Sequence, residues 1–283
     1  MVAFMLLLSN KTLVAQTLPN DKSEDALDLL DDRLDSLDAL ALQKPYIQIS
    51  GNYVSQVAYN GRTEGVTQFG ISPSATWHIG KGWLLNYNGT AWSAAQPSYT
   101  YTGIGAAKTF TLGDFDAQIG YNRLFFNDGI PLAKADFTHE IEVSSSYSVG
   151  DFSLDAYFLR LGGKTAGNFV APSVSWATKH RFGDKRQYKW YIGPQISAEL
   201  GDDVTSQIIR KGKLNGKPSP PRAVTKTVFG LLNYQLSARA GLKTTNTELE
   251  VSYIYNLPKN TTLPNTNTAF GYFEIEVKKR FVW

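Results

Sequence analysis

The connections between successive alternating segments constrain this chain most. From residue 45 onward, apolar and polar residues alternate in segments of roughly 12–15 residues. The sequence predicts strands near 45–59, 66–79, 83–95, 98–112, 115–126, 136–149, 152–161, 169–182, 187–199, 225–242, 247–257 and 268–283. Connections after even-numbered strands are tight, as at Gly113-Asp114, while most of those after odd-numbered strands are long, as at 200–224. This sorting predicts an all-β fold, an antiparallel up-and-down transmembrane β-barrel of about 12 strands.

The two faces of the predicted strands support a membrane barrel. In the last strand, Phe273, Ile275 and Val277 share one face, while Glu274, Glu276 and Lys278 share the other. The strands predicted at 187–199 and 247–257 alternate in the same way. One face can therefore meet lipid while the other lines a polar lumen.

Aromatic residues gather beside the predicted short turns. The chain has 15 Tyr, 15 Phe and 6 Trp. The residues concerned are Trp77, Trp83, Phe110, Phe115, Tyr147, Phe152, Phe182, Tyr188, Phe281 and Trp283. Amphipathic rings favour the headgroup level of a membrane, so this pattern predicts an interfacial girdle. The aromatic core of a soluble barrel, the competing interpretation, would place these rings in mid-strand.

The last strand also carries a family resemblance. Its end, Phe281-Val282-Trp283, with alternating apolar positions before it, resembles the terminal strand of bacterial outer-membrane β-barrel proteins. The resemblance covers residues 45–283. It implies a place in the outer membrane of a Gram-negative bacterium, in contact with lipopolysaccharide. It also implies that the barrel assembly machinery recognises Phe281 and Trp283.

The first 44 residues differ from the predicted barrel. Residues 1–16 are expected to be a signal peptide without a basic start, and their end, Val14-Ala15-Gln16, resembles exported proteins of the Bacteroidota. Residues 17–44 are expected to form a periplasmic acidic amphipathic helix and linker. Its apolar stripe contains Leu27, Leu30, Leu34 and Leu37. The helix, at 21–42, either packs on the rim or in the mouth of its own barrel, where it can act as a plug, or binds a periplasmic or outer-membrane protein partner.

Charged residues predict two further features. A lumen charge ladder is expected from Glu248, Glu250, Glu274, Glu276, Lys278 and Arg280, with Glu248 and Glu250 opposite Lys278 and Arg280. The ladder either closes the lumen or selects a cation or a small polar solute. A basic extracellular loop is expected to contain Arg210, Lys211, Lys213, Lys217 and Arg222. This loop either meets lipopolysaccharide phosphates or an acidic partner, or is simply solvated.

The sequence offers little for catalysis. The chain has no Cys, and its histidines are His78, His139 and His180. His139 is expected to face outward, on the strand face opposite to Ser144, while His78 and His180 are assigned to the interface. We therefore predict no catalytic residues, metal site or cofactor, and no nucleic-acid binding.

The sequence therefore leads to one main functional hypothesis. The chain is expected to be a non-enzymatic outer-membrane barrel, either a narrow passive channel for small polar solutes or a scaffold subunit of an envelope complex. The alternative is an outer-membrane lipid hydrolase of the phospholipase or lipid A deacylase type.

Overall fold

The structure is a computed structural model of the 283-residue chain. It describes residues 45–57, 68–93, 99–127, 137–163, 166–183, 188–209, 213–214, 217–218, 222–259 and 268–282. Within 203–227 it describes the backbone alone. The predicted signal peptide, the helix with Leu27, Leu30, Leu34 and Leu37, and Trp283 lie outside the described residues.

The described chain consists of strands joined by turns and loops. The strands are β1 (Tyr46–Val54), β2 (Gly70–Gly80), β3 (Trp83–Trp92), β4 (Tyr99–Leu112), β5 (Phe115–Phe126), β6 (Phe137–Val149), β7 (Phe152–Gly163), β8 (Gly167–Trp176), β9 (Thr178–Phe182), β10 (Tyr188–Ile209), β11 (Lys213–Leu214), β12 (Lys217–Pro218), β13 (Arg222–Lys243), β14 (Thr247–Pro258) and β15 (Phe270–Val282). Among the residues described, no helix is long and apolar enough to cross a membrane.

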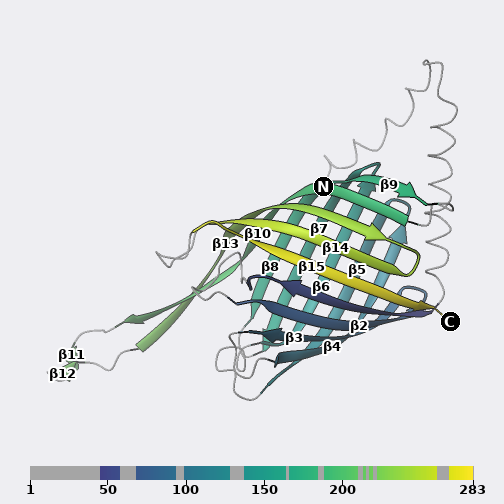
Figure 1. The fold of residues 1–283 in the computed structure, drawn as a ribbon. Coiled ribbons are helices and arrows are strands. Elements are labelled where there is room, and N and C mark those ends of the chain that lie inside the picture. Colours follow the sequence, from purple (N-terminus) through teal and green to yellow (C-terminus); the bar gives the residue numbers. More distant parts are fainter. Residues whose placement is uncertain are drawn as a thin grey trace. The chain divides into compact units, whose positions relative to one another are not determined.

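Pairing between neighbouring strands closes the sheet into a barrel (Figure 1). Each wall strand pairs antiparallel with the next along the chain, and β15 pairs with β1. β8 and β9 both pair with β10 and together form one wall strand, interrupted at Ala177. The wall therefore has 12 strands, which confirms the predicted fold. Gly113 and Gly150 have positive φ angles of 60° and 58° in the tight turns, a conformation that glycine adopts without strain.

The predicted loop at 200–224 is largely wrong. β10 and β13 stay paired with each other as far as Ile209 and Arg222. Arg222 therefore belongs to a strand, and Lys213 and Lys217 lie in the short strands β11 and β12. Both long strands are rich in Val, Thr and Ile here, and β-branched residues favour extended backbone. The charged and proline residues between them had suggested one long loop.

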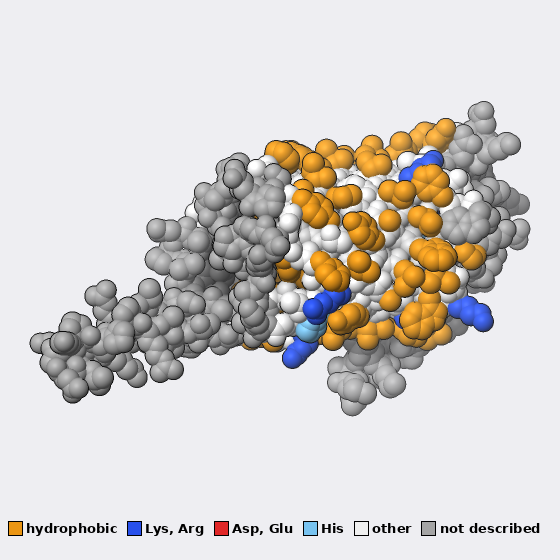
Figure 2. Space-filling model, turned by 90° about the horizontal axis from the view of Figure 1, so that it is seen from below, with side chains coloured by type: hydrophobic (Ala, Val, Ile, Leu, Met, Phe, Trp, Pro, Cys, Tyr) orange, Lys and Arg blue, Asp and Glu red, His pale blue; other side chains and the backbone are white. Residues whose placement is uncertain are grey.

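The outer surface of the barrel is apolar. Ile49, Tyr53, Ile104, Ile196 and Phe273 are among its exposed hydrophobic side chains. Figure 2 shows one face of this surface, which hydrophobic side chains dominate and on whose described part no acidic side chain is visible. Such a surface is stable against lipid and not against water. The chain therefore has the closed fold and the apolar outer surface of a membrane-spanning β-barrel, as predicted.

Aromatic side chains are exposed at the strand ends beside the short turns. They include Trp77, Trp83, Phe110, Phe115, Phe152, Phe182 and Phe281. The ammonium group of Lys108 lies 5.3 Å from the centre of the Trp83 ring and 5.7 Å from that of Phe110. A lysine among rings is typical of a membrane interface, where its charged end reaches the headgroups. This arrangement agrees with the predicted girdle.

Candidate functional site

The inner face of the barrel is the candidate site, because polar side chains from neighbouring strands meet there. Strand alternation turns every second residue inward, and these residues are mainly Asn, Gln, Ser, Thr, Glu and Tyr. Four groups of contacts, described in turn below, join them across the wall.

The first group spans β3 to β6. The register aligns Asn86, Gly105, Asn122 and Glu140 on four successive strands. The Asn86 amide Nδ2 donates to Asn122 Oδ1 at 2.8 Å, across β4. Asn122 Nδ2 in turn donates to Glu140 Oε1 at 3.1 Å and to Glu142 Oε1 at 3.3 Å.

Glycine makes the first group possible. A Cβ atom at Gly105 would lie 1.8 Å from Asn122 Oδ1 and 2.4 Å from the backbone oxygen of Tyr121. Any larger residue at this position would therefore separate Asn86 from Asn122. The signal was present in the sequence, as Gly103 and Gly105 at two inward positions of one strand.

The second group, on β10 and β13 to β15, contains the predicted charge ladder. Across β13, the hydroxyl of Tyr191 donates to Glu248 Oε1 at 3.2 Å and also to Glu250 Oε2. Gly241 of β13 gives the space, since a Cβ there would lie 2.2 Å from Tyr191 Cζ. Gly105 makes space for a contact across β4 in the same way. Tyr191 was not predicted from the sequence.

The register settles which ladder residues face each other. Glu248 pairs with Lys278, Glu250 with Glu276, and Ser252 with Glu274. Lys278 Nζ forms an ion pair with Glu276 Oε2 at 2.7 Å, within one strand. The expected opposition of Glu250 and Arg280 is not formed, because Arg280 lies beside the β13–β14 turn, where its backbone N donates to Asn246 O.

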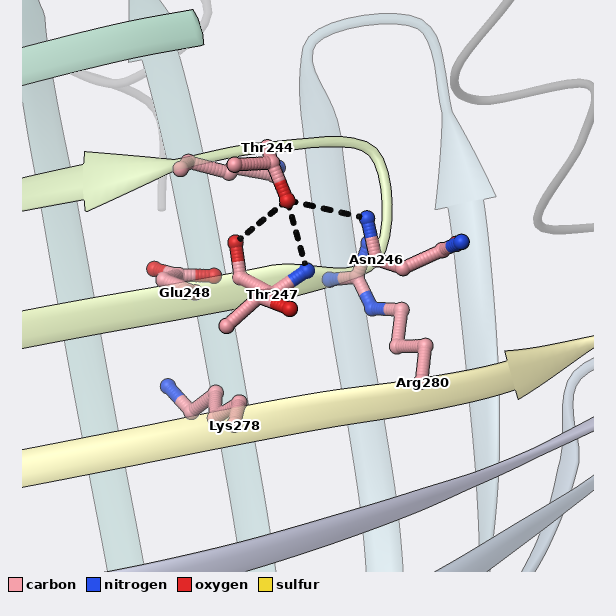
Figure 3. Close-up of a pocket in the computed structure, with 7 residues that line it drawn as sticks. Thr244, Asn246, Thr247, Glu248, Lys278 and Arg280 are labelled. Atoms are coloured by element: carbon pink, nitrogen blue, oxygen red, sulfur yellow. Dashed lines mark hydrogen bonds between the residues drawn. The ribbon is translucent and has the colours of Figure 1, made fainter.

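Figure 3 shows the short-turn end of this ladder, at the β13–β14 turn. Glu248 and Lys278 lie side by side on neighbouring strands, and Arg280 lies next to Asn246. The Thr244 hydroxyl accepts hydrogen bonds from the backbone N of Asn246 and of Thr247. The turn is thereby fixed by its own side chain, which holds the register of the ladder.

The third group lies at the short-turn end of the lumen. The rings of Tyr46 and His78 stack with centroids 3.8 Å apart, and Tyr46 is only 5% exposed. Arg280 lies 6.0 Å from the Tyr46 ring centre, and its Nε donates to Gln48 Oε1 at 3.3 Å. The assignment of His78 to the membrane interface is therefore wrong, because strand alternation turns it inward. His180 pairs with Trp190 on the outer side, as expected for an interfacial residue.

The fourth group lies toward the long-connection end. Asn233 Nδ2 donates to Glu199 Oε2 at 2.9 Å and to Asn256 Oδ1 at 2.7 Å. Both asparagines are almost fully buried. Closer to the short turns, Arg239 Nη2 donates to Ser175 Oγ at 3.0 Å.

The remaining predicted residues fall largely outside this site. Phe281 is exposed on the outer face of β15. The side chains of Arg210, Lys211, Lys213, Lys217 and Arg222 are not among those described. Among the residues described, no group of His, Asp or Glu could hold a metal ion.

Comparison with known proteins gives likenesses of fold alone. No family model and no curated protein matches the chain. Solved structures similar to it include LpxR from Salmonella typhimurium, 9% identical with a TM-score of 0.46, over 82% of this chain and 99% of that one. The NanC porin is 10% identical with a TM-score of 0.44 (82% and 98%), and the KdgM porin is 10% identical with a TM-score of 0.42 (83% and 99%). At such identities, roles cannot be transferred residue by residue.

Proposed function

We propose that this barrel is a narrow passive channel for small polar solutes. The observation that carries the proposal is the polar inner face, whose hydrogen-bonded groups line the wall from the short turns to the long connections. A barrel of this strand number is narrow, so polar side chains on its inner face lie within reach of a solute. Small solutes that form hydrogen bonds suit such a lining.

Several buried polar atoms of the lumen support the proposal. Asn52 Oδ1, Asn86 Oδ1 and Arg239 Nε are buried without a hydrogen-bond partner in the described structure. Buried polar groups almost always have a partner, so we expect water or a polar solute at these atoms. Glu140, Glu142 and Glu274 accept hydrogen bonds from the amides of Asn122 and Asn52. These carboxylates favour a cation or a hydrogen-bond donor as the solute.

Single-channel conductance in planar bilayers tests the proposal. The full chain and a variant lacking residues 17–43 are compared, each folded in detergent. We expect a small, steady conductance from the full chain, or a conductance that appears only after the truncation if the acidic segment plugs the lumen. Silence from both proteins would contradict a channel and favour the scaffold role.

The lipid hydrolase is the competing function. Thr138 Oγ1 lies 3.3 Å from His139 Nδ1, in reach of lipid, whereas Ser144 faces the lumen. Lipid release by the purified chain and by His139→Gln would test it. Release that His139→Gln abolishes would favour the hydrolase, and absence of release would exclude it under those conditions.

We also propose that the barrel assembly machinery recognises Phe281 and Trp283. The basic residues of 210–222 are proposed to bind lipopolysaccharide or an acidic partner.

A further inference from the structure

Three basic side chains interrupt the apolar outer surface at one end of the barrel. Arg123 of β5 pairs with His139 of β6, and Arg160 of β7 lies one strand further along. All three share the outer face with Tyr121 and Ile141, which are exposed hydrophobic residues. We call Arg123, His139 and Arg160 the outer basic cluster. Figure 2 shows a histidine between Lys or Arg side chains at one end of this largely apolar face, and further Lys or Arg side chains toward the other end.

The local backbone shapes this cluster. The register of β6 shifts between Phe137 and His139, so Thr138 is an extra residue beside the histidine. Such bulges re-aim side chains. The Thr138 hydroxyl lies 3.3 Å from Arg123 Nη1 and 3.3 Å from His139 Nδ1. The bulge thereby links two members of the cluster.

Neighbouring residues also make space for the histidine. A Cβ at Gly162 would lie 2.2 Å from His139 Nε2, so the imidazole rests over a position without a side chain. On its other side, the ring stacks on Tyr121 with centroids 6.1 Å apart. His139 therefore lies between the Tyr121 ring and Gly162, on the strand between those of the two arginines.

The position along the strands sets the depth of the cluster. Arg123 is three residues from the end of β5, His139 is the third residue of β6, and Arg160 is three residues from the end of β7. All three lie toward the long connections. Charged side chains on the lipid face are costly at mid-membrane and are tolerated near the interface. We therefore expect the cluster at headgroup level, on the side opposite to the short turns.

Asp202, which is linked to Arg160 through Asn168, already has partners of its own. Arg160 Nη1 donates to Asn168 Oδ1 at 3.2 Å. The backbone N and the Nδ2 of Asn168 both donate to Asp202 Oδ2, at 2.7 and 2.9 Å. Asp202 is thus joined to the cluster through Asn168, and the guanidinium of Arg123 donates to a neutral hydroxyl. Both arginines keep further N–H donors for an anion.

We propose that the outer basic cluster binds a phosphate group of the lipid in the surrounding outer leaflet. Guanidinium groups recognise phosphate by paired hydrogen bonds, and Tyr121 and Ile141 below the cluster offer an apolar surface to the acyl chains of the same lipid. The cluster lies outside the lumen, so this lipid site is independent of the proposed channel.

Lipid binding by the full chain in detergent tests the site. The probes are lipid A carrying its phosphates and the same lipid A with the phosphates removed, each in mixed micelles. In Arg123→Gln/Arg160→Gln we expect affinity for phosphorylated lipid A to fall at least about tenfold, because two charge-assisted contacts are lost. Affinity for the dephosphorylated lipid should be the same in both proteins. Equal binding of phosphorylated lipid A by wild type and double variant would overturn the proposal.

Matched controls sharpen the result. Lys279→Gln removes an outward basic side chain near the other end of the barrel and should leave binding unchanged. Conductance of the double variant should equal that of the wild type, so failure of the lipid site and failure of the channel are distinguishable. Displacement of lipid A by a moderate concentration of inorganic phosphate would show that the site binds free anions, and would overturn the lipid assignment. If the double variant does not fold, Arg160→Gln alone decides, and unchanged binding by it overturns the proposal.

Discussion

In two parts of the lumen wall, a glycine lets side chains contact each other across a strand, but the two parts differ in charge. In β3 to β6, which we call the first wall, Asn86 donates to Asn122 across Gly105, and Asn122 donates to Glu140. In β10 to β15, the second wall, Tyr191 donates to Glu250 across Gly241, and Lys278 is paired with Glu276. The basic residues of the first wall, Lys108, Arg123 and His139, face outward. The first wall thus presents carboxylates held by amides, while the second balances its carboxylates with a base. The comparison indicates that glycine sets which side chains meet and that strand parity sets the charge left in the lumen.

The largest expected effect on stability comes from placing a side chain at Gly105 in the first wall. Gly105→Val would place Cβ within 1.8 Å of Asn122 Oδ1. We expect the free energy of unfolding to fall by about 3 kcal/mol or more, since overpacking adds to lost hydrogen bonds. Urea unfolding in lipid vesicles measures it. Gly51→Val is the matched control, because a Cβ at Gly51 meets nothing within 4 Å. Equal destabilisation of both would show that close approach at Gly105 is unimportant.

Removing the Tyr191 hydroxyl of the second wall should lower the free energy of unfolding by less. Tyr191→Phe loses the hydrogen bonds to Glu248 and Glu250. The Tyr191 hydroxyl has one proton, which the two carboxylates share, and a hydrogen bond to a charged group contributes about 1.5–3 kcal/mol, so a loss in this range is expected in the same urea experiment. Tyr121→Phe on the outer face serves as control. A Tyr191→Phe barrel as stable as wild type would mean that the second network adds no stability.

A measurement of ion selectivity would test the difference in charge between the two walls. Glu140→Gln/Glu142→Gln removes carboxylates that are held by an amide, whereas Glu276→Gln removes one that is paired with Lys278. If the lumen conducts, the first change should move the potassium-to-chloride permeability ratio toward one, and the second should change it less. Reversal potentials in asymmetric potassium chloride measure both. A larger shift in Glu276→Gln would contradict the comparison.

The smallest effect on stability is expected from the ion pair itself. Lys278 and Glu276 are 2.7 Å apart, but their side chains are 27% and 30% exposed. Partly solvated pairs contribute little, so Lys278→Gln should lower the free energy of unfolding by less than about 1 kcal/mol. A loss as large as that of Tyr191→Phe would show that Lys278 also neutralises Glu248, which faces it in the register.

Much of the fold could be predicted from local patterns. The predicted strand 115–126 agrees with β5, and the tight turns lie where Gly and Asp were found. These features depend on alternation and turn chemistry within a few residues. The extension of β10 and β13 was missed, because charge and proline were given more weight than the β-branched residues on both sides.

The contacts of the site were harder to predict. Glu248 and Lys278 were expected to be neighbours and are, but Arg280 lies beside Gln48 of β1 instead of facing Glu250. The partner strand of β15 at this point comes from the other end of the barrel sequence. Likewise, His78 follows the inward parity of its strand, and its stacking on Tyr46 shows only in the pairing of β1 with β2.

The sequence by itself determined the class of the protein: the strands, their two faces and the side of each connection, because a period of two and turn residues act locally. Only the tertiary structure decided most of the contacts between inward side chains. Closure of β1 on β15 fixes the stagger of all strands at once, and the glycine gaps at Gly105 and Gly241 then let side chains contact across a whole strand. The outer basic cluster has the same origin, since Arg123, His139 and Arg160 come together only through the register of three strands and one bulge.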